Sequence, residues 1–179
     1  MMKKYAVLLF GALIIALCFK LQKTGAAVDL GHFPLIKKTR NKFIDDNYLH
    51  ALETERSFGV PVITSLSQGA MESGWGKSKL YNLNNVHCIK CKKHKTGIKG
   101  CCITINNSDG ISAFKVYGSR KESWDAYVKT LSKSRYNGAV NDNYIESAKF
   151  IAKGGWATEH DYIERWMPIM GKVKNILDE

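Results

Sequence analysis

Glu72 is the residue in this sequence that is best suited to acid–base chemistry. It lies in the run Gln68–Ser78, at the end of a stretch with helical spacing, and Gly-Trp-Gly follows one residue later. Glycine is a poor helix former, and an unpaired buried carboxylate is costly, so folding alone explains this combination poorly. A carboxyl group in an apolar pocket has a raised pKa and can donate a proton near neutral pH. Cleavage of a glycosidic bond requires a proton donor of this kind.

The element that must position Glu72 is a helix expected over residues 61–72, which begins after Gly59 at Pro61. Helical geometry predicts an apolar side and an opposite polar side. The apolar side contains Ile63, Leu66 and Ala70, and the polar side contains Ser65, Gln68 and Glu72. Gln68 precedes Glu72 by four residues, so their side chains are expected to be neighbours. The alternative is an ordinary solvent-facing acid, but the compact aromatic turn beside Glu72 favours a functional interpretation.

The other elements predict an α+β domain, mainly helical, with a small β-hairpin lobe and a cleft between two lobes. An amphipathic helix is expected over residues 41–57, with Phe43, Leu49, Leu52 and Phe58 on its apolar side. Asp109-Gly110 between two β-rich segments predicts a hairpin. Further helical patterns cover residues 120–133, 143–153 and 159–177.

The N-terminal residues 1–27 have the pattern of an export signal. Two lysines precede an apolar run from Ala6 to Phe19, and small residues follow at Gly25–Ala27. The run is shorter than an ordinary membrane span, although a retained inner-membrane anchor is the alternative to cleavage. Residues 28–40 are expected to be an irregular lead-in, and residues 41–179 the domain that carries Glu72. We therefore expect a periplasmic or secreted protein, and a monomer.

The formal net charge of +11 indicates attraction to polyanions, but no nucleic-acid-binding motif accompanies the basic residues. Four cysteines, Cys88, Cys91, Cys101 and Cys102, lie close together. Their spacing allows either a structural zinc site or two disulfides. Export to an oxidising compartment favours disulfides that join Cys88 and Cys91 to Cys101 and Cys102 in either order. No bound metal and no cofactor are expected.

Five segments in order resemble the bacterial glucosaminidases of glycoside hydrolase family seventy-three, from about Phe43 to Met170. The run around Glu72 resembles the helix-end signature of that family, and Asn84–Lys90 is similar to its Asn-Asn-Leu-Phe-Gly-Ile-Lys segment. The other three segments are Phe114–Ser123, Arg135-Tyr136 and Gly155–Tyr162.

The resemblance implies a lysozyme-like fold and hydrolysis of the β-1,4 bond after N-acetylglucosamine in the glycan strands of peptidoglycan. It assigns the catalytic acid to Glu72 and an important tyrosine to Tyr162. Trp75 and Asn85 match cleft positions, and Gln68 and Tyr136 are further candidates for substrate binding. Val86-His87-Cys88 stands where the family has Leu-Phe-Gly.

A second carboxylate is harder to assign. Asp109 lies in the hairpin where the base would be sought, but an Asp before Gly is also a common turn former. If Asp109 is the base, a wide separation of the carboxyl groups predicts inversion. If no second carboxylate is in reach, the substrate's own acetamido group assists the reaction instead. Three alternative functions remain compatible with the sequence. They are a lytic transglycosylase or muramidase of the same fold, a non-catalytic wall-binding protein, and a zinc-stabilised interaction module.

Overall fold

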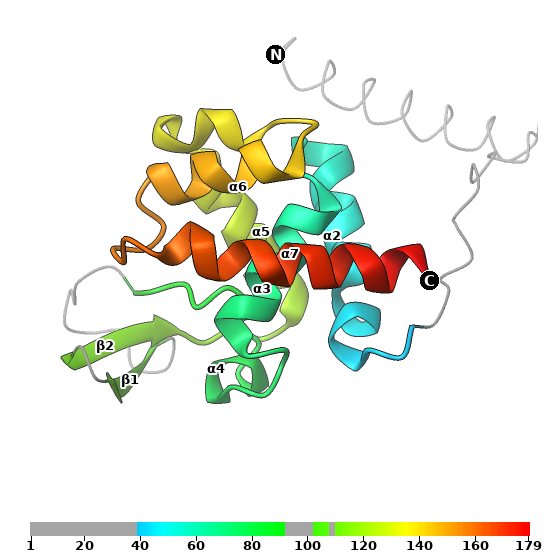
Figure 1. The fold of residues 1–179 in the computed structure, drawn as a ribbon. Coiled ribbons are helices and arrows are strands. Elements are labelled where there is room, and N and C mark those ends of the chain that lie inside the picture. Colours follow the sequence, from blue (N-terminus) through cyan, green and yellow to red (C-terminus); the bar gives the residue numbers. More distant parts are fainter. Residues whose placement is uncertain (1–38, 92–101, 108–109) are drawn as a thin grey trace, which may run out of the picture. The chain divides into compact units, whose positions relative to one another are not determined.

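A computed structural model of the chain describes residues 39–91, 102–107 and 110–179 (Figure 1). This part is mainly helical and contains a two-stranded antiparallel sheet, so the expected α+β class is confirmed. Its elements are α2 (Lys42–Phe58), α3 (Val62–Ser73), α4 (Lys79–Asn82), β1 (Cys102–Asn107), β2 (Gly110–Lys115), α5 (Arg120–Leu131), the 3-10 helix η1 (Ser134–Ala139), α6 (Tyr144–Lys153) and α7 (Tyr162–Asp178).

Helix α3 is the central helix of the described residues, because it packs against α2, α6 and α7 (Figure 1). Every residue from Thr64 to Ala70 is buried. We predicted one apolar and one polar side for this helix, but both sides pack against protein. The polar residues are satisfied internally. Thr64 donates to the carbonyl of Tyr144 at 3.0 Å, and the Trp166 indole donates to Ser67 at 2.7 Å. Small side chains on α3 therefore let its neighbours pack closely around the helix that ends at Glu72.

Helix α2 agrees with its predicted bounds, but its buried side differs from the expected one. Leu49 is 43% exposed, whereas Asn47 is fully buried. The Asn47 amide donates to Tyr81 at 3.0 Å and accepts from the Trp124 indole at 3.2 Å. Because both ends of this amide are bonded, the polar side chain is tolerated in the core, and the helix turns Leu49 toward solvent. The expectation that Leu49 lies on the buried side was therefore wrong.

Local side-chain bonds fix the ends of the helices. Asn41 caps α2 by accepting from the Ile44 N–H, and Gly59 ends the helix in the left-handed conformation. Ser119 caps α5, and Glu122 accepts from the Gly118 N–H at 3.0 Å, so this acid stabilises the start of the helix. The short helices α4 and η1 were not predicted, because each is too brief to show a clear periodicity.

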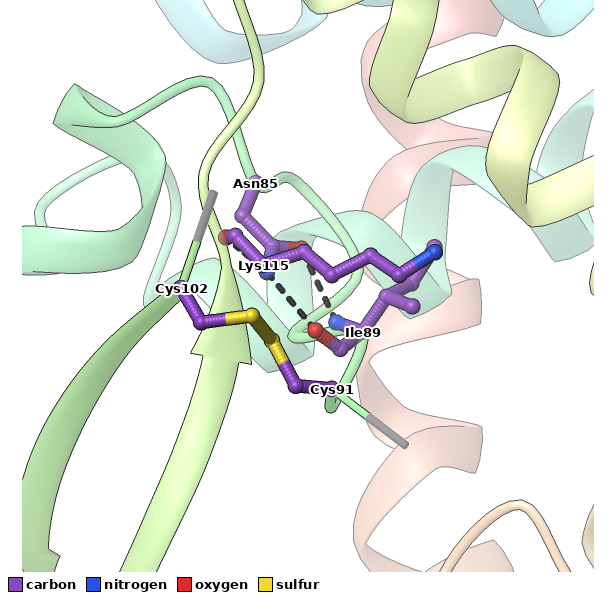
Figure 2. The surroundings of a disulfide bond; sticks show 5 residues. All are labelled: Asn85, Ile89, Cys91, Cys102 and Lys115. Carbon is purple, nitrogen blue, oxygen red and sulfur yellow. Dashed lines mark hydrogen bonds between the residues drawn. A yellow bond between two sulfur atoms is a disulfide. The ribbon is translucent and has the colours of Figure 1, made fainter. Parts of the chain in front are cut away.

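The hairpin pairs Cys102 with Lys115 at one end and Asn107 with Gly110 at the other. A disulfide between Cys91 and Cys102 joins β1 to the segment after α4 (Figure 2). The Lys115 N–H donates to the carbonyl of Ile89 at 3.0 Å, which holds the other strand to the same segment. Asn85 is fully buried beside this junction. Its side chain accepts from Ile89 N–H at 2.9 Å and donates to the carbonyl of Lys115 at 2.9 Å, so it attaches the hairpin to the helical part.

Four expectations concern residues that the structure does not describe. The signal peptide or anchor of residues 1–27 lies outside the described residues, as does the lead-in 28–40 apart from its last two residues. Asp109 and Cys101 also lie outside them. Among the described helices, none has the length and apolarity needed to cross a membrane.

Candidate active site

Glu72 occupies the last turn of α3, where the chain reverses abruptly. Gly74 has φ 58° and ends the helix, and its N–H bonds to the carbonyls of the last turn. Trp75 also has a positive φ of 59°, and its N–H donates to the Ala70 carbonyl at 2.7 Å. A positive φ is uncommon for a large side chain, so the turn is held by the bonds around it. The predicted helix end and aromatic turn are thus observed at Glu72.

The carboxyl group of Glu72 accepts two hydrogen bonds, and both reach the same oxygen. The Tyr162 hydroxyl donates to Oε1 at 2.7 Å, and the Trp156 indole N–H donates to Oε1 at 3.1 Å. Tyr162 is the first residue of α7, and Trp156 lies in the segment that connects α6 to α7. Within the described residues, Oε2 accepts no hydrogen bond. The two oxygens of this carboxyl group are therefore chemically distinct.

Burial raises the pKa of the Glu72 carboxyl above its ordinary value. The hydrogen bonds from Tyr162 and Trp156 act in the opposite direction, because they stabilise the ionised form, but burial outweighs them. The negative charge of the exposed Glu159 adds a smaller upward effect on the pKa. Glu72 therefore holds its proton to a higher pH than an exposed glutamate, as a general acid requires.

Behind Tyr162 lies a buried hydrogen-bond chain. The Gln68 amide N–H donates to the Tyr162 hydroxyl oxygen at 3.0 Å, and the Tyr127 hydroxyl donates to the Gln68 amide oxygen at 2.8 Å. Gln68 is fully buried. We expected it to bind substrate directly, but the structure places it behind Tyr162, with both ends of its amide bonded to tyrosines.

His87 and Cys88 also lie against α3. His87 is fully buried, stacks on Tyr127 with 3.9 Å between ring centroids, and lies 3.2 Å from the Ser65 carbonyl through Nε2. Burial lowers its pKa to about 3, so the ring is neutral at physiological pH. His87 thus takes the place of an aromatic core residue.

Cys88 contacts the helix that carries Glu72. Its thiol donates to the backbone carbonyl of Glu72 at 3.0 Å, and burial raises the thiol pKa to about 12. Cys88 is free in the structure, so the expectation that it forms a disulfide was wrong. The physical reason is its position, because its thiol is directed at the end of α3. The Cys91–Cys102 bond belongs to one of the two expected pairings. That bond occupies two of the four thiols that the zinc alternative needs.

Two further aromatic residues were expected to contact substrate. Trp75 is half-buried, with Phe43 at its edge and the Lys172 ammonium 4.9 Å from its ring centroid. Tyr136 is only 1% exposed. Its ring lies beside Trp156, with 6.3 Å between centroids, and beneath the Arg135 guanidinium. Tyr136 therefore supports Trp156 from behind, whereas Trp75 retains a partly open ring.

The sequence did not identify Trp156 and Tyr127 as parts of the site. Trp156 falls within the Gly155–Tyr162 segment, and Tyr127 follows Trp124 on the buried side of α5. Both looked like ordinary core aromatics, and only the fold brings their polar atoms to Glu72 and Gln68. Among the described residues, no group of three His, Cys, Asp or Glu side chains is arranged to hold a metal ion.

A helical body with a small hairpin attached near a helix-end acid is the arrangement of lysozyme-like glycoside hydrolases. Solved structures with this fold match the chain. The glycoside hydrolase domain of FlgJ from Salmonella typhimurium has 26% identity and a TM-score of 0.61, covering 76% of this chain and 89% of that one. The peptidoglycan hydrolase from Sphingomonas sp. A1 has 24% identity and a TM-score of 0.63, covering 72% and 85%.

The glucosaminidase family, described as mannosyl-glycoprotein endo-beta-N-acetylglucosaminidase, matches residues 48–175. The chain belongs to this family of glycoside hydrolases. It is also 27% identical over 173 residues to the peptidoglycan hydrolase FlgJ of Vibrio cholerae serotype O1, a match that covers 89% of this chain. The match covers 50% of that relative, so this chain spans about half the length of the curated relatives it resembles.

Proposed function

We propose that the protein is a peptidoglycan hydrolase that cleaves the β-1,4 bond after N-acetylglucosamine, with Glu72 as the general acid. The observation that carries the proposal is the environment of the Glu72 carboxyl group, which lies at the end of the central helix with Oε1 bonded to Tyr162 and Trp156. Membership of the glucosaminidase family supports the reaction class. Relatives that are named peptidoglycan hydrolases support the choice of substrate.

In the proposed reaction, protonated Glu72 gives its proton to the glycosidic oxygen. The bond from the sugar carbon C1 to that oxygen breaks, and the leaving sugar departs as an alcohol. The oxygen of a water molecule forms a new bond to C1 and releases one proton. The two bonds from Tyr162 and Trp156 stabilise the carboxylate that Glu72 becomes as its proton leaves.

The stereochemistry of the product identifies the group that assists the water. If Asp109 takes the proton of water on the opposite face of the sugar, the product is inverted. If the acetamido oxygen of the substrate first bonds to C1, a cyclic intermediate forms. Water then attacks C1 and opens the ring of this intermediate, and Glu72 recovers a proton from the water. The configuration at C1 is retained in this route. NMR of the fresh product distinguishes the two routes by its anomeric signal, and Asp109→Asn abolishes activity only in the inverting route.

Trp75 is the residue that we propose to stack on a sugar ring, because its ring is partly open. Asn85 and Tyr136 act indirectly in this proposal, since their buried side chains hold the hairpin and Trp156. We also propose that the protein works as a monomer in the periplasm or outside the cell. The Cys91–Cys102 disulfide supports an oxidising compartment, and N-terminal sequencing of the mature protein distinguishes a cleaved signal from a retained anchor.

Mass spectrometry of the products from purified peptidoglycan tests the proposal. Fragments that end in a reducing N-acetylglucosamine are the expected result. Reducing muramic ends would indicate a muramidase, and anhydro-muramic ends would indicate a lytic transglycosylase. If the folded protein binds peptidoglycan but releases no fragments, it is a wall-binding protein instead.

A further inference from the structure

We infer that Gln68 and Tyr127 are positioning residues that keep the Tyr162 hydroxyl donating its hydrogen bond to Oε1 of Glu72. Glu72 then donates its own proton to the substrate from Oε2. This inference rests on the proposed function, because it concerns how the same acid works. Among the described residues, neither the Gln68 side-chain amide nor the Tyr127 hydroxyl forms a hydrogen bond with the Glu72 carboxyl group, and both residues are fully buried. They act through the hydroxyl group of Tyr162, which is the one group between the Gln68 amide and the carboxyl.

The direction of the chain follows from what each group can donate. The amide oxygen of Gln68 only accepts, so the Tyr127 hydroxyl must donate to it. The amide nitrogen only donates, so the Tyr162 oxygen must accept from it. Tyr162 then has one proton left, and its partner at 2.7 Å is Oε1 of Glu72. Each hydroxyl proton in the chain therefore has one acceptor.

The opposite orientation of the Gln68 amide leaves a proton without a partner. With its nitrogen toward Tyr127, the Tyr127 oxygen would accept, and its own proton would lack an acceptor among the described residues. A buried hydroxyl proton without a partner is costly. The amide oxygen would meanwhile face Tyr162 and compete with Glu72 for its proton. The Tyr127 hydroxyl therefore fixes the orientation that sends the Tyr162 proton to Glu72.

The rings hold this chain in place. Tyr127 stacks on His87 at an interplanar angle of 11°, and Trp156 meets the Tyr127 ring edge-on with 5.5 Å between centroids. Tyr162 packs edge-on against Trp166 with 5.7 Å between centroids. These contacts do not involve the hydroxyl groups. A Tyr127→Phe substitution therefore keeps the packing and removes only the polar atom.

The consequence for Glu72 concerns its two oxygens. Oε1 accepts from Tyr162 and from the indole of Trp156, which can only donate. When the carboxyl group is protonated, its proton belongs on Oε2, because Oε1 already accepts from these two donors of the described residues. The chain thus selects the oxygen that delivers the proton to substrate.

The test measures the pH dependence of turnover and the Glu72 titration in Tyr127→Phe. We expect kcat to fall about tenfold with KM unchanged, since the amide is free to turn and divert the Tyr162 proton. The alkaline limb of the kcat profile should move up by about one pH unit, because Glu72 loses a bond that lowers its pKa. Carbon-13 NMR of glutamate-labelled protein, assigned with Glu72→Gln, should show the same upward shift.

The matched control is Tyr81→Phe, which removes another hydroxyl that forms buried hydrogen bonds, one accepted from the Asn47 amide at 3.0 Å. It should lower stability without moving the alkaline limb. The double variant Tyr127→Phe with Gln68→Met removes the competing acceptor, so the alkaline limb should return toward that of the wild type. An unshifted limb and unshifted Glu72 titration in folded Tyr127→Phe would overturn the inference, as would an equal shift in Tyr81→Phe. The NMR titration needs no activity, so it remains decisive even if the proposed reaction is wrong.

Discussion

The Tyr162 hydroxyl lies 2.7 Å from Oε1 of Glu72, although 90 positions separate the two residues in the chain. Glu72 ends α3 and Tyr162 begins α7, so the contact depends on the packing of these two helices against each other.

Tyr162→Phe is expected to lower kcat about 100-fold, because the carboxylate that forms as Glu72 gives up its proton loses its shorter hydrogen bond. The same bond lowers the Glu72 pKa, so its loss raises that pKa. A general acid works while it is protonated, and the alkaline limb of the pH–rate profile should therefore move to higher pH. Profiles of both proteins from pH 4 to 9 provide the measurement. A shift to lower pH would be inconsistent with this role.

Trp156→Phe should have a smaller effect in the same direction. Its hydrogen bond to Glu72 is longer, at 3.1 Å, and the phenyl ring keeps the contacts with Tyr127 and Tyr136. We expect kcat to fall about tenfold, with a smaller rise of the alkaline limb. Trp124→Phe is the matched control, because it loses an indole bond to Asn47 and none to Glu72. Equal limb shifts in the two variants would contradict the assignment of Trp156.

Reduction of the Cys91–Cys102 disulfide should destabilise the protein by about 2–3 kcal/mol, because the bond closes a loop with a sequence separation of 11. Unfolding in guanidinium with and without dithiothreitol measures the difference. A Cys91→Ser variant should start at the lower stability and show no response to the reductant. If the variant responded as strongly as the wild type, the disulfide would not be the source of the effect.

His87 should make the protein sensitive to acid. Its folded-state pKa of about 3 lies below the ordinary value of 6.5. Between pH 3 and pH 6.5 the imidazole is therefore protonated in the unfolded state but neutral in the folded state. Stability is therefore fully present above about pH 6.5 and falls as the pH decreases toward 3. From pH 7 to 4.5 the loss from this residue is on the order of 2–3 kcal/mol. His87→Phe should remove it, as measured by guanidinium unfolding at both pH values.

The His87→Phe comparison also separates this residue from Glu72, whose raised pKa acts in the opposite sense on stability. A raised carboxyl pKa stabilises the folded state at low pH and loses that contribution as the pH rises. Glu72 is present in both proteins, so the difference between them reports on His87. An identical decline in stability from pH 7 to 4.5 in both would show that His87 does not control it.

The sequence contained enough to predict the helix that ends at Glu72 and the hairpin. Local signals define these features: the spacing before Glu72, the turn at Gly74, and Asp-Gly between two β-rich segments. The family resemblance added Tyr162, which no local pattern connects to Glu72. The hydrogen bond at 2.7 Å gives that pairing a geometric basis.

The parts that were missed depend on tertiary packing. Gln68 has the spacing of a solvent-facing residue, yet α7 and α5 cover it and supply the tyrosines that satisfy its amide. Leu49 matches the apolar spacing of α2, but a doubly bonded Asn47 takes the buried position. Cys88 was assigned to a disulfide because cysteines in an exported chain usually pair, and the structure instead directs its thiol to the backbone of Glu72.

The most direct test of the central claim is a parallel digestion of purified peptidoglycan by the wild type and by Glu72→Gln, with products quantified by mass spectrometry. Glu53→Gln, an exposed change on α2, serves as the control. The account predicts reducing N-acetylglucosamine ends from the wild type and from Glu53→Gln, and a fall of about 1,000-fold in Glu72→Gln with its fold and stability retained. Near-wild-type release of these ends by folded Glu72→Gln would contradict the assignment of Glu72 as the acid.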